Sequence, residues 1–128
     1  MISTSFAGNA LLLIFGLLLI FHLLVLSGLI PSNIVWAGKI TNRKELIRME
    51  SISILMLLIV ALIVAIKMKY LSLGISPTIV NVGVWIVFGL FCLNTLGNMT
   101  AKSPFEKYGF GLLTLMISLL ALRLAIGP

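Results

Sequence analysis

The chain has 128 residues, of which 61% are hydrophobic and only 9% are charged. A water-soluble core of this length could not bury so much apolar surface, so the composition excludes a soluble protein and predicts one membrane domain, 1–128. The net charge of +6 does not indicate nucleic-acid binding, because the basic residues are spread over several turns and helix ends. The only cysteine, Cys92, excludes a dithiol redox centre within one chain.

Four apolar segments approach the roughly 20 residues that a helix needs to cross a bilayer. The first, about 7–30, is too long for the apolar part of a signal peptide and is interpreted as a retained helix. The second is predicted at 43–66, the third at 77–99 and the fourth at 104–125. Asn42, Ser76 and Ser103 are the expected N-caps, and a proline follows each serine. These segments predict an all-α, membrane-spanning antiparallel four-helix bundle with short turns.

A short internal repeat relates the two halves of the chain. Residues 38–43 resemble residues 97–102, and each segment follows one apolar helix and precedes the next. The repeat predicts two duplicated helical hairpins in the same orientation. Helix contacts within the bundle are expected at isolated glycines such as Gly16, Gly83 and Gly89.

The basic residues predict the orientation of the chain in the membrane. Six lie near the turns after the first and third helices, namely Lys39, Arg43, Lys44, Arg48, Lys102 and Lys107. Three lie toward the other side, namely Lys67, Lys69 and Arg123. Because cytoplasmic turns carry the excess of lysine and arginine, we expect both termini outside and the charged turns inside.

The end of the third helix carries polar residues at a regular spacing. Asn94, Asn98 and Lys102 are four residues apart, which places them on one face of a helix. One interpretation is that these asparagines join helices by hydrogen bonds. The other is a polar pocket open to the aqueous side, because amides within membranes often mark substrate or ion paths.

The single histidine, His22, lies within the first helix. It is either a neutral imidazole bonded to a hydroxyl or carbonyl, or a proton relay or ligand contact. At a similar depth the other helices offer Ser53, Cys92, Asn94 and Thr114, so a shared polar cluster is one prediction.

Glu50 is the carboxylate nearest to the membrane boundary, and Arg48 is close in sequence. Glu50 either pairs with a base at the lipid surface or forms a cation or proton site. We expect no metal and no cofactor, because one histidine without a cysteine or carboxylate cluster cannot form a metal site. Arg43, Arg48 and Glu50 only loosely resemble the motif of glutathione-using membrane enzymes, and the asparagine of that motif is missing.

Several segments, 36–39, 48–53, 91–98, 105–107 and 122–125, resemble a group of small, uncharacterised four-helix membrane proteins of bacteria. The resemblance implies a bacterial inner-membrane location. It implies no activity and no catalytic or binding residues.

Three functions remain open from the sequence. The first is a non-enzymatic subunit or partner of a membrane assembly, paired with copies of itself or with another membrane protein. The second is a small oligomeric transporter or channel with a polar cavity open to the cytoplasm. The third is a membrane enzyme acting on a lipid-soluble or thiol substrate. The hypothetical binding cluster comprises His22, Arg48, Glu50, Ser53, Asn94, Asn98 and Lys102.

Overall fold

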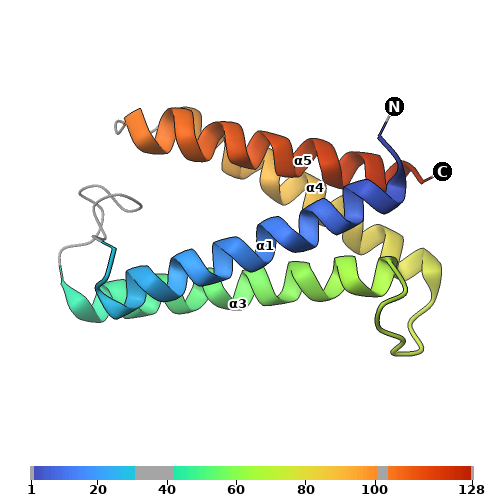
Figure 1. The fold of residues 1–128 in the computed structure, drawn as a ribbon, viewed down its shortest axis with the longest axis horizontal. Helices are drawn as coiled ribbons and strands as arrows, with labels where there is room; N and C mark the ends of the chain where they lie inside the picture. The colour runs from blue at the N-terminus through green and yellow to red at the C-terminus, as the bar shows by residue number, and fades with distance from the viewer. Residues whose placement is uncertain (1, 31–41, 101–103, 128) are drawn as a thin grey trace.

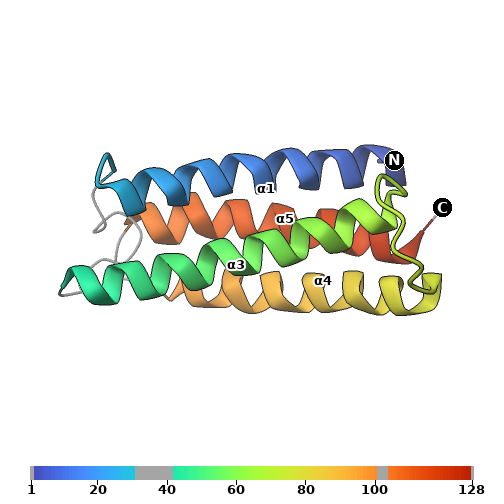
Figure 2. The ribbon, with the colours of Figure 1, turned by 90° about the horizontal axis from the view of Figure 1, so that it is seen from below.

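The computed structural model describes residues 2–30, 42–100 and 104–127. In these ranges the chain is an all-α four-helix bundle without strands, as the sequence predicts. The helical elements are α1 (Thr4–Ser27), α3 (Arg43–Lys67), α4 (Pro77–Met99), the π-helical turn η1 (Phe105–Phe110) and α5 (Gly111–Ile126). They run side by side in alternating directions, and both chain termini lie at the same end of the bundle (Figure 1, Figure 2).

Local capping explains where the helices begin and end. The Ser3 hydroxyl accepts a hydrogen bond from the Phe6 amide at 3.0 Å, and Gly28 ends α1 with a φ of 90°. As a result, α1 begins and ends three residues before the predicted range 7–30. The Asn42 side chain accepts from the Glu45 amide at 2.8 Å and so caps α3. The predicted cap Ser103 lies outside the described residues.

Four helical stretches are long and apolar enough to cross a membrane, namely Thr4–Ser27, Arg43–Lys67, Pro77–Met99 and Lys107–Ile126. Large apolar side chains cover their outer faces; Leu13, for example, is 65% exposed and Leu93 is 67% exposed. Exposing so large a continuous apolar surface to water would be energetically unfavourable, whereas the hydrocarbon of a membrane solvates it. The protein is therefore a small multi-pass membrane protein.

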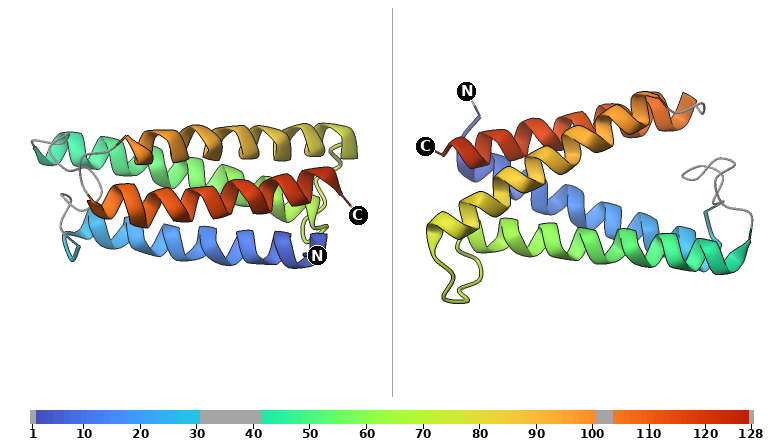
Figure 3. Two further views of the ribbon diagram at one scale, coloured as in Figure 1. Left: turned by 90° about the horizontal axis from the view of Figure 1, so that it is seen from above. Right: turned by 180° about the vertical axis from the view of Figure 1, so that it is seen from behind.

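The helices pair as two hairpins. Packing is most extensive within α4–α5 and within α1–α3, and it is sparser between α3 and α4. The two hairpins meet near the chain termini and diverge toward the opposite end, as the side views show (Figure 1, Figure 3). We call these the narrow end and the wide end. The predicted repeat cannot be compared, because residues 38–41 and 101–102 lie outside the described residues.

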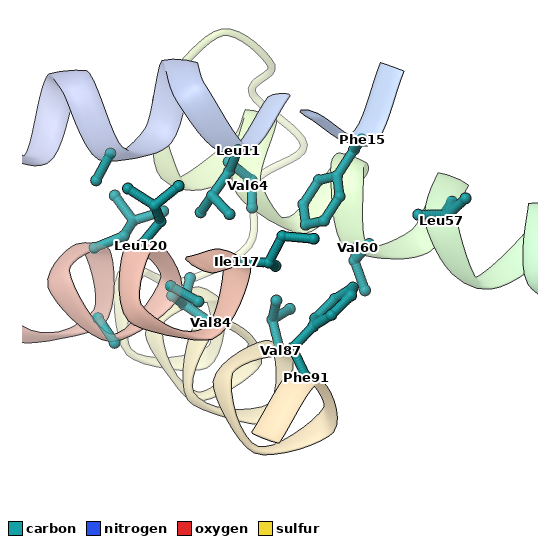
Figure 4. Close-up of a cluster of buried hydrophobic side chains, with 14 residues drawn as sticks. Leu11, Phe15, Leu57, Val60, Val64, Val84, Val87, Phe91, Ile117 and Leu120 are labelled. Carbon is teal, nitrogen blue, oxygen red and sulfur yellow. The ribbon is translucent and has the colours of Figure 1, made fainter. Parts of the chain in front are cut away.

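The hydrophobic core joins the hairpins on the narrow-end side of their divergence (Figure 4). The rings of Phe15 in α1 and Phe91 in α4 stack with their centroids 5.7 Å apart. Val60 from α3 and Ile117 from α5 are also buried in this cluster. All four helices therefore contribute to a closed apolar layer.

Among the described glycines, close approach occurs at Gly8, which the sequence did not single out, and at Gly83, which it did. A Cβ on the buried Gly8 would lie 2.0 Å from the Met68 sulfur, whereas a Cβ on Gly16 or Gly89 would have no neighbour within 4 Å. Of the predicted glycine contacts, only Gly83 lies close to another helix; a Cβ there would lie 3.2 Å from Cγ2 of Ile63. The predicted contacts at Gly16 and Gly89 are therefore wrong, because both positions face open space.

This difference between glycines predicts opposite effects of the same substitution. We expect Gly8→Ala to lower the free energy of unfolding by about 1 kcal/mol, because Met68 must move aside. Gly16→Ala is expected to be neutral or slightly stabilising, because alanine has the higher helix propensity. Thermal unfolding of both variants in one detergent measures the difference. Equal melting temperatures would contradict the close approach at Gly8.

Candidate functional site

A pocket of about 410 Å³ lies between the two hairpins where they diverge. We call it the interhairpin pocket. Its apolar lining is Leu18, Ile52, Met56, Leu57, Val60, Leu90, Phe91, Leu93, Phe110 and Leu113, with Gly97. Its polar lining is His22, Ser53, Asn94, Asn98 and Thr114. Core residues such as Val60 and Phe91 close the pocket toward the narrow end.

A carboxylate and an imidazole from different helices meet beside this pocket. Nδ1 of His22 in α1 lies 2.5 Å from Oε2 of Glu50 in α3. The Glu50 side chain is completely buried, and the His22 side chain is 13% exposed. His22 lines the pocket, whereas Glu50 does not, so the carboxylate lies behind the imidazole. The sequence names both residues as candidates but predicts other partners for them.

The pair results from the antiparallel arrangement of α1 and α3. His22 lies about one and a half turns before the end of α1, and Glu50 lies about two turns after the start of α3. Two adjacent antiparallel helices therefore bring both side chains to a similar depth. Burying a carboxylate is costly unless a hydrogen-bonding partner accompanies it, and His22 provides that partner.

The second ring nitrogen of His22 remains accessible. In the part of the chain that the structure describes, Nδ1 is the only His22 side-chain atom with a hydrogen-bond partner. No enclosed side-chain nitrogen or oxygen among the described residues lacks a partner, so Nε2 is not enclosed. Because Nδ1 faces Glu50, we infer that Nε2 is the nitrogen available to the pocket.

The asparagines of α4 have different roles. Asn98 Nδ2 donates to the Thr114 hydroxyl of α5 at 3.5 Å, which is a long hydrogen bond between helices. Thr114 also accepts from the buried Thr95 hydroxyl at 3.0 Å. Asn94 lines the pocket without a side-chain hydrogen bond to any described residue. Asn98 thus fits the helix-joining interpretation, and Asn94 fits the pocket interpretation.

Thr114 lines the pocket and belongs to the shared polar cluster that the sequence suggested, although it is not in the hypothetical binding cluster. Its hydroxyl also donates to the Phe110 carbonyl at 2.8 Å, at the junction of η1 and α5. Threonine commonly forms such a bond within any helix. The aromatic contact between Phe21 and Phe110, with centroids 5.6 Å apart, is also tertiary and links α1 to η1.

The remaining predicted residues separate into three groups. Ser53 is half-buried and lines the pocket together with His22, Asn94 and Asn98. Arg48 is exposed and does not line the pocket. Lys102 lies outside the described residues. The structure therefore gathers four predicted residues around one pocket, places Glu50 directly behind it and leaves Arg48 apart.

The pocket opens between α3 and α4. Its exposed lining residues belong to these two helices and are Ile52, Met56, Leu93, Asn94 and Gly97. The lining residues from α1 and α5, including His22 and Thr114, form the inner wall. In a membrane-spanning bundle the outer faces of α3 and α4 contact hydrocarbon, so this side of the pocket is accessible from the bilayer. The aqueous opening that the sequence suggested stays a prediction.

Within the described residues, no three histidine, cysteine, aspartate or glutamate side chains form a group that could hold a metal ion. The fold and the site define a small multi-pass membrane protein with a laterally open pocket. No family model, curated protein or solved structure matches the chain.

Proposed function

We propose that the protein binds a lipid-soluble amphipathic molecule in the interhairpin pocket and acts as a small membrane carrier. The observation that carries the proposal is the meeting of His22, Ser53 and Asn94, from three different helices, in one cavity. Polar groups within a membrane are costly, and those that line a cavity characteristically mark a solute path.

The dimensions and chemistry of the pocket support this function. A cavity of about 410 Å³ falls within the range of small-molecule sites, which are mostly apolar with a few polar groups that orient the ligand. The opening between α3 and α4 gives a solute dissolved in the bilayer direct access. An amphipathic molecule can place its polar group against His22 and Asn94 and its apolar part against Leu57 and Val60.

The closed core favours a carrier over an open channel. The pocket ends at the Phe15–Phe91 stack and the side chains around it, so no continuous aqueous path leads to the narrow end. Carriers typically present a central site to one side at a time. The enzyme alternative required a cleft joining Arg48, Glu50 and Asn98, and Arg48 is separate from the pocket.

Photolabelling tests this function with a matched pair of variants. The probe is an aliphatic alcohol carrying a diazirine, added to the protein in lipid nanodiscs. We expect adducts on pocket-lining peptides of α3 and α4, competed by excess decanol. Ser53→Phe fills the pocket and should reduce these adducts at least fivefold. Ser51→Phe adds the same ring on the exposed face of α3 and should leave them unchanged.

The outcome is read by mass spectrometry of the labelled peptides. Adducts spread evenly over the lipid-facing helix surfaces, without competition by decanol, would contradict the proposed function. Equal labelling of the Ser53→Phe and Ser51→Phe variants would do the same. Circular dichroism of both variants checks that each keeps its helical content.

The carrier is proposed to lie in a bacterial inner membrane with both termini outside, and reporter tags at either terminus test this orientation. Support for it comes from the sequence, in which six basic residues lie near the turns after the first and third predicted helices and three lie toward the other side. The alternative role as a subunit, with a second copy or another membrane protein as partner, is tested by crosslinking in native membranes.

A further inference from the structure

We propose that the ligand is an uncharged, lipid-soluble aromatic hydroxyl compound, a phenol or hydroquinone, whose O–H donates to Nε2 of His22. This inference rests on the proposed function and names the chemical class of the solute. The argument depends on the tautomer of His22, on the absence of charge from the described pocket wall and on the aromatic part of the lining.

Glu50 selects the tautomer of His22. When the Glu50 carboxylate acts as the acceptor of this hydrogen bond, the proton lies on Nδ1 and points toward Oε2. Nε2 of this tautomer carries a lone pair. The pocket then presents a hydrogen-bond acceptor, and the ligand group that matches it is an O–H donor.

The wall of the pocket favours an uncharged donor over an ammonium group. Glu50 is completely buried and does not line the pocket, and no other acidic residue does so among the described residues. The charged side chains that precede Glu50 in α3 are Arg43, Lys44, Glu45 and Arg48, of which the three basic ones are exposed and Glu45 does not line the pocket. A cation would lose its hydration on entering the pocket without gaining a carboxylate in the wall.

The remaining lining accommodates an aromatic body with an alkyl substituent. Phe91 and Phe110 both line the cavity, and buried aliphatic side chains such as Leu57 and Val60 line it as well. Aromatic rings prefer offset or edge-on contacts with other rings, and phenols are stronger hydrogen-bond donors than aliphatic alcohols. The side-chain amide of Asn94 can bind a second oxygen on the ligand.

A pair of matched competitors tests the hydroxyl requirement. Para-octylphenol and para-octylanisole differ only in replacement of the hydroxyl hydrogen by a methyl group. Each is titrated against the diazirine alcohol label in nanodiscs containing the wild-type protein. We expect the phenol to compete at about a tenfold lower concentration, which is the effect of one hydrogen bond of about 1.4 kcal/mol.

Variants assign this preference to the imidazole. In the double variant His22→Phe/Glu50→Leu the preference should fall to less than twofold, because the acceptor and its buried partner are both removed. Asn94→Leu should keep the ratio of the two competitors, because neither carries the second oxygen that the Asn94 amide would bind. Octylamine, included as a third competitor, should bind more weakly than the phenol.

The results separate the inference from the function on which it depends. Absence of competable pocket labelling would contradict the proposed function itself. Competable labelling with equal competition by phenol and anisole, or tighter competition by octylamine, would overturn the inference alone. Retention of the tenfold preference in the double variant would also overturn it, because the acceptor would then lie elsewhere.

Discussion

Replacing His22 by phenylalanine is expected to lower the free energy of unfolding by about 3 kcal/mol. Glu50 is completely buried against Nδ1 of His22, so the substitution removes a hydrogen-bonding partner from a buried carboxylate. Removing one member of a buried pair typically costs several kcal/mol, because the remaining charge keeps its desolvation penalty. Unfolding in mixed micelles with increasing dodecyl sulfate, followed by circular dichroism, measures the change.

The double variant His22→Phe/Glu50→Leu is the informative control for this experiment. We expect its stability to lie within about 1 kcal/mol of the wild type, because apolar replacement of a whole buried pair is often neutral or stabilising. A double variant as unstable as His22→Phe would show that the pair is required for the fold. Near-native stability with loss of the phenol preference would assign the pair to binding rather than to folding.

The second large effect is expected in the core. Phe15→Ala should lower the free energy of unfolding by about 2 kcal/mol, because Phe15 is fully buried and stacks on Phe91. In a membrane the cost comes from lost packing, since lipid solvates a phenyl ring as well as the protein interior does. The same unfolding titration in mixed micelles measures it.

Phe6→Ala is the matched control, because Phe6 belongs to the same helix but is 58% exposed. It should change the unfolding free energy by less than about 0.5 kcal/mol, as surface substitutions usually do. Equal losses from Phe15→Ala and Phe6→Ala would contradict the described core. Because Phe91 closes the pocket, Phe15→Ala should also broaden the photolabelling pattern toward the narrow end.

The sequence predicted the helices better than their contacts. Capping residues such as Asn42 and Ser76 are local signals, and both accept the predicted hydrogen bonds from the third residue beyond them. Glycine contacts depend on which faces of two helices meet. Gly16 and Gly89 are small residues of the kind found at helix contacts, but no side chain or neighbouring helix lies close to them. Gly8, in contrast, packs against Met68.

Part of the site was also visible in the sequence. His22, Ser53, Asn94 and Asn98 are polar residues in apolar segments, and the cost of placing such groups in lipid identifies them as candidates. Their convergence on one pocket depends on helix rotation. Arg48 illustrates this dependence, because it is two residues from Glu50 yet exposed on another face of α3.

The amino-acid sequence alone determined that four segments form helices suited to hydrocarbon, because length and apolar composition are local properties of each segment. The tertiary structure decided which polar groups are neighbours. The pairing of His22 with Glu50 requires α1 and α3 to pack antiparallel at one register, and the lateral opening requires the α4–α5 hairpin to diverge from them. Helices that are apolar on all sides carry little information about which face turns inward, so packing and buried hydrogen bonds determine that choice.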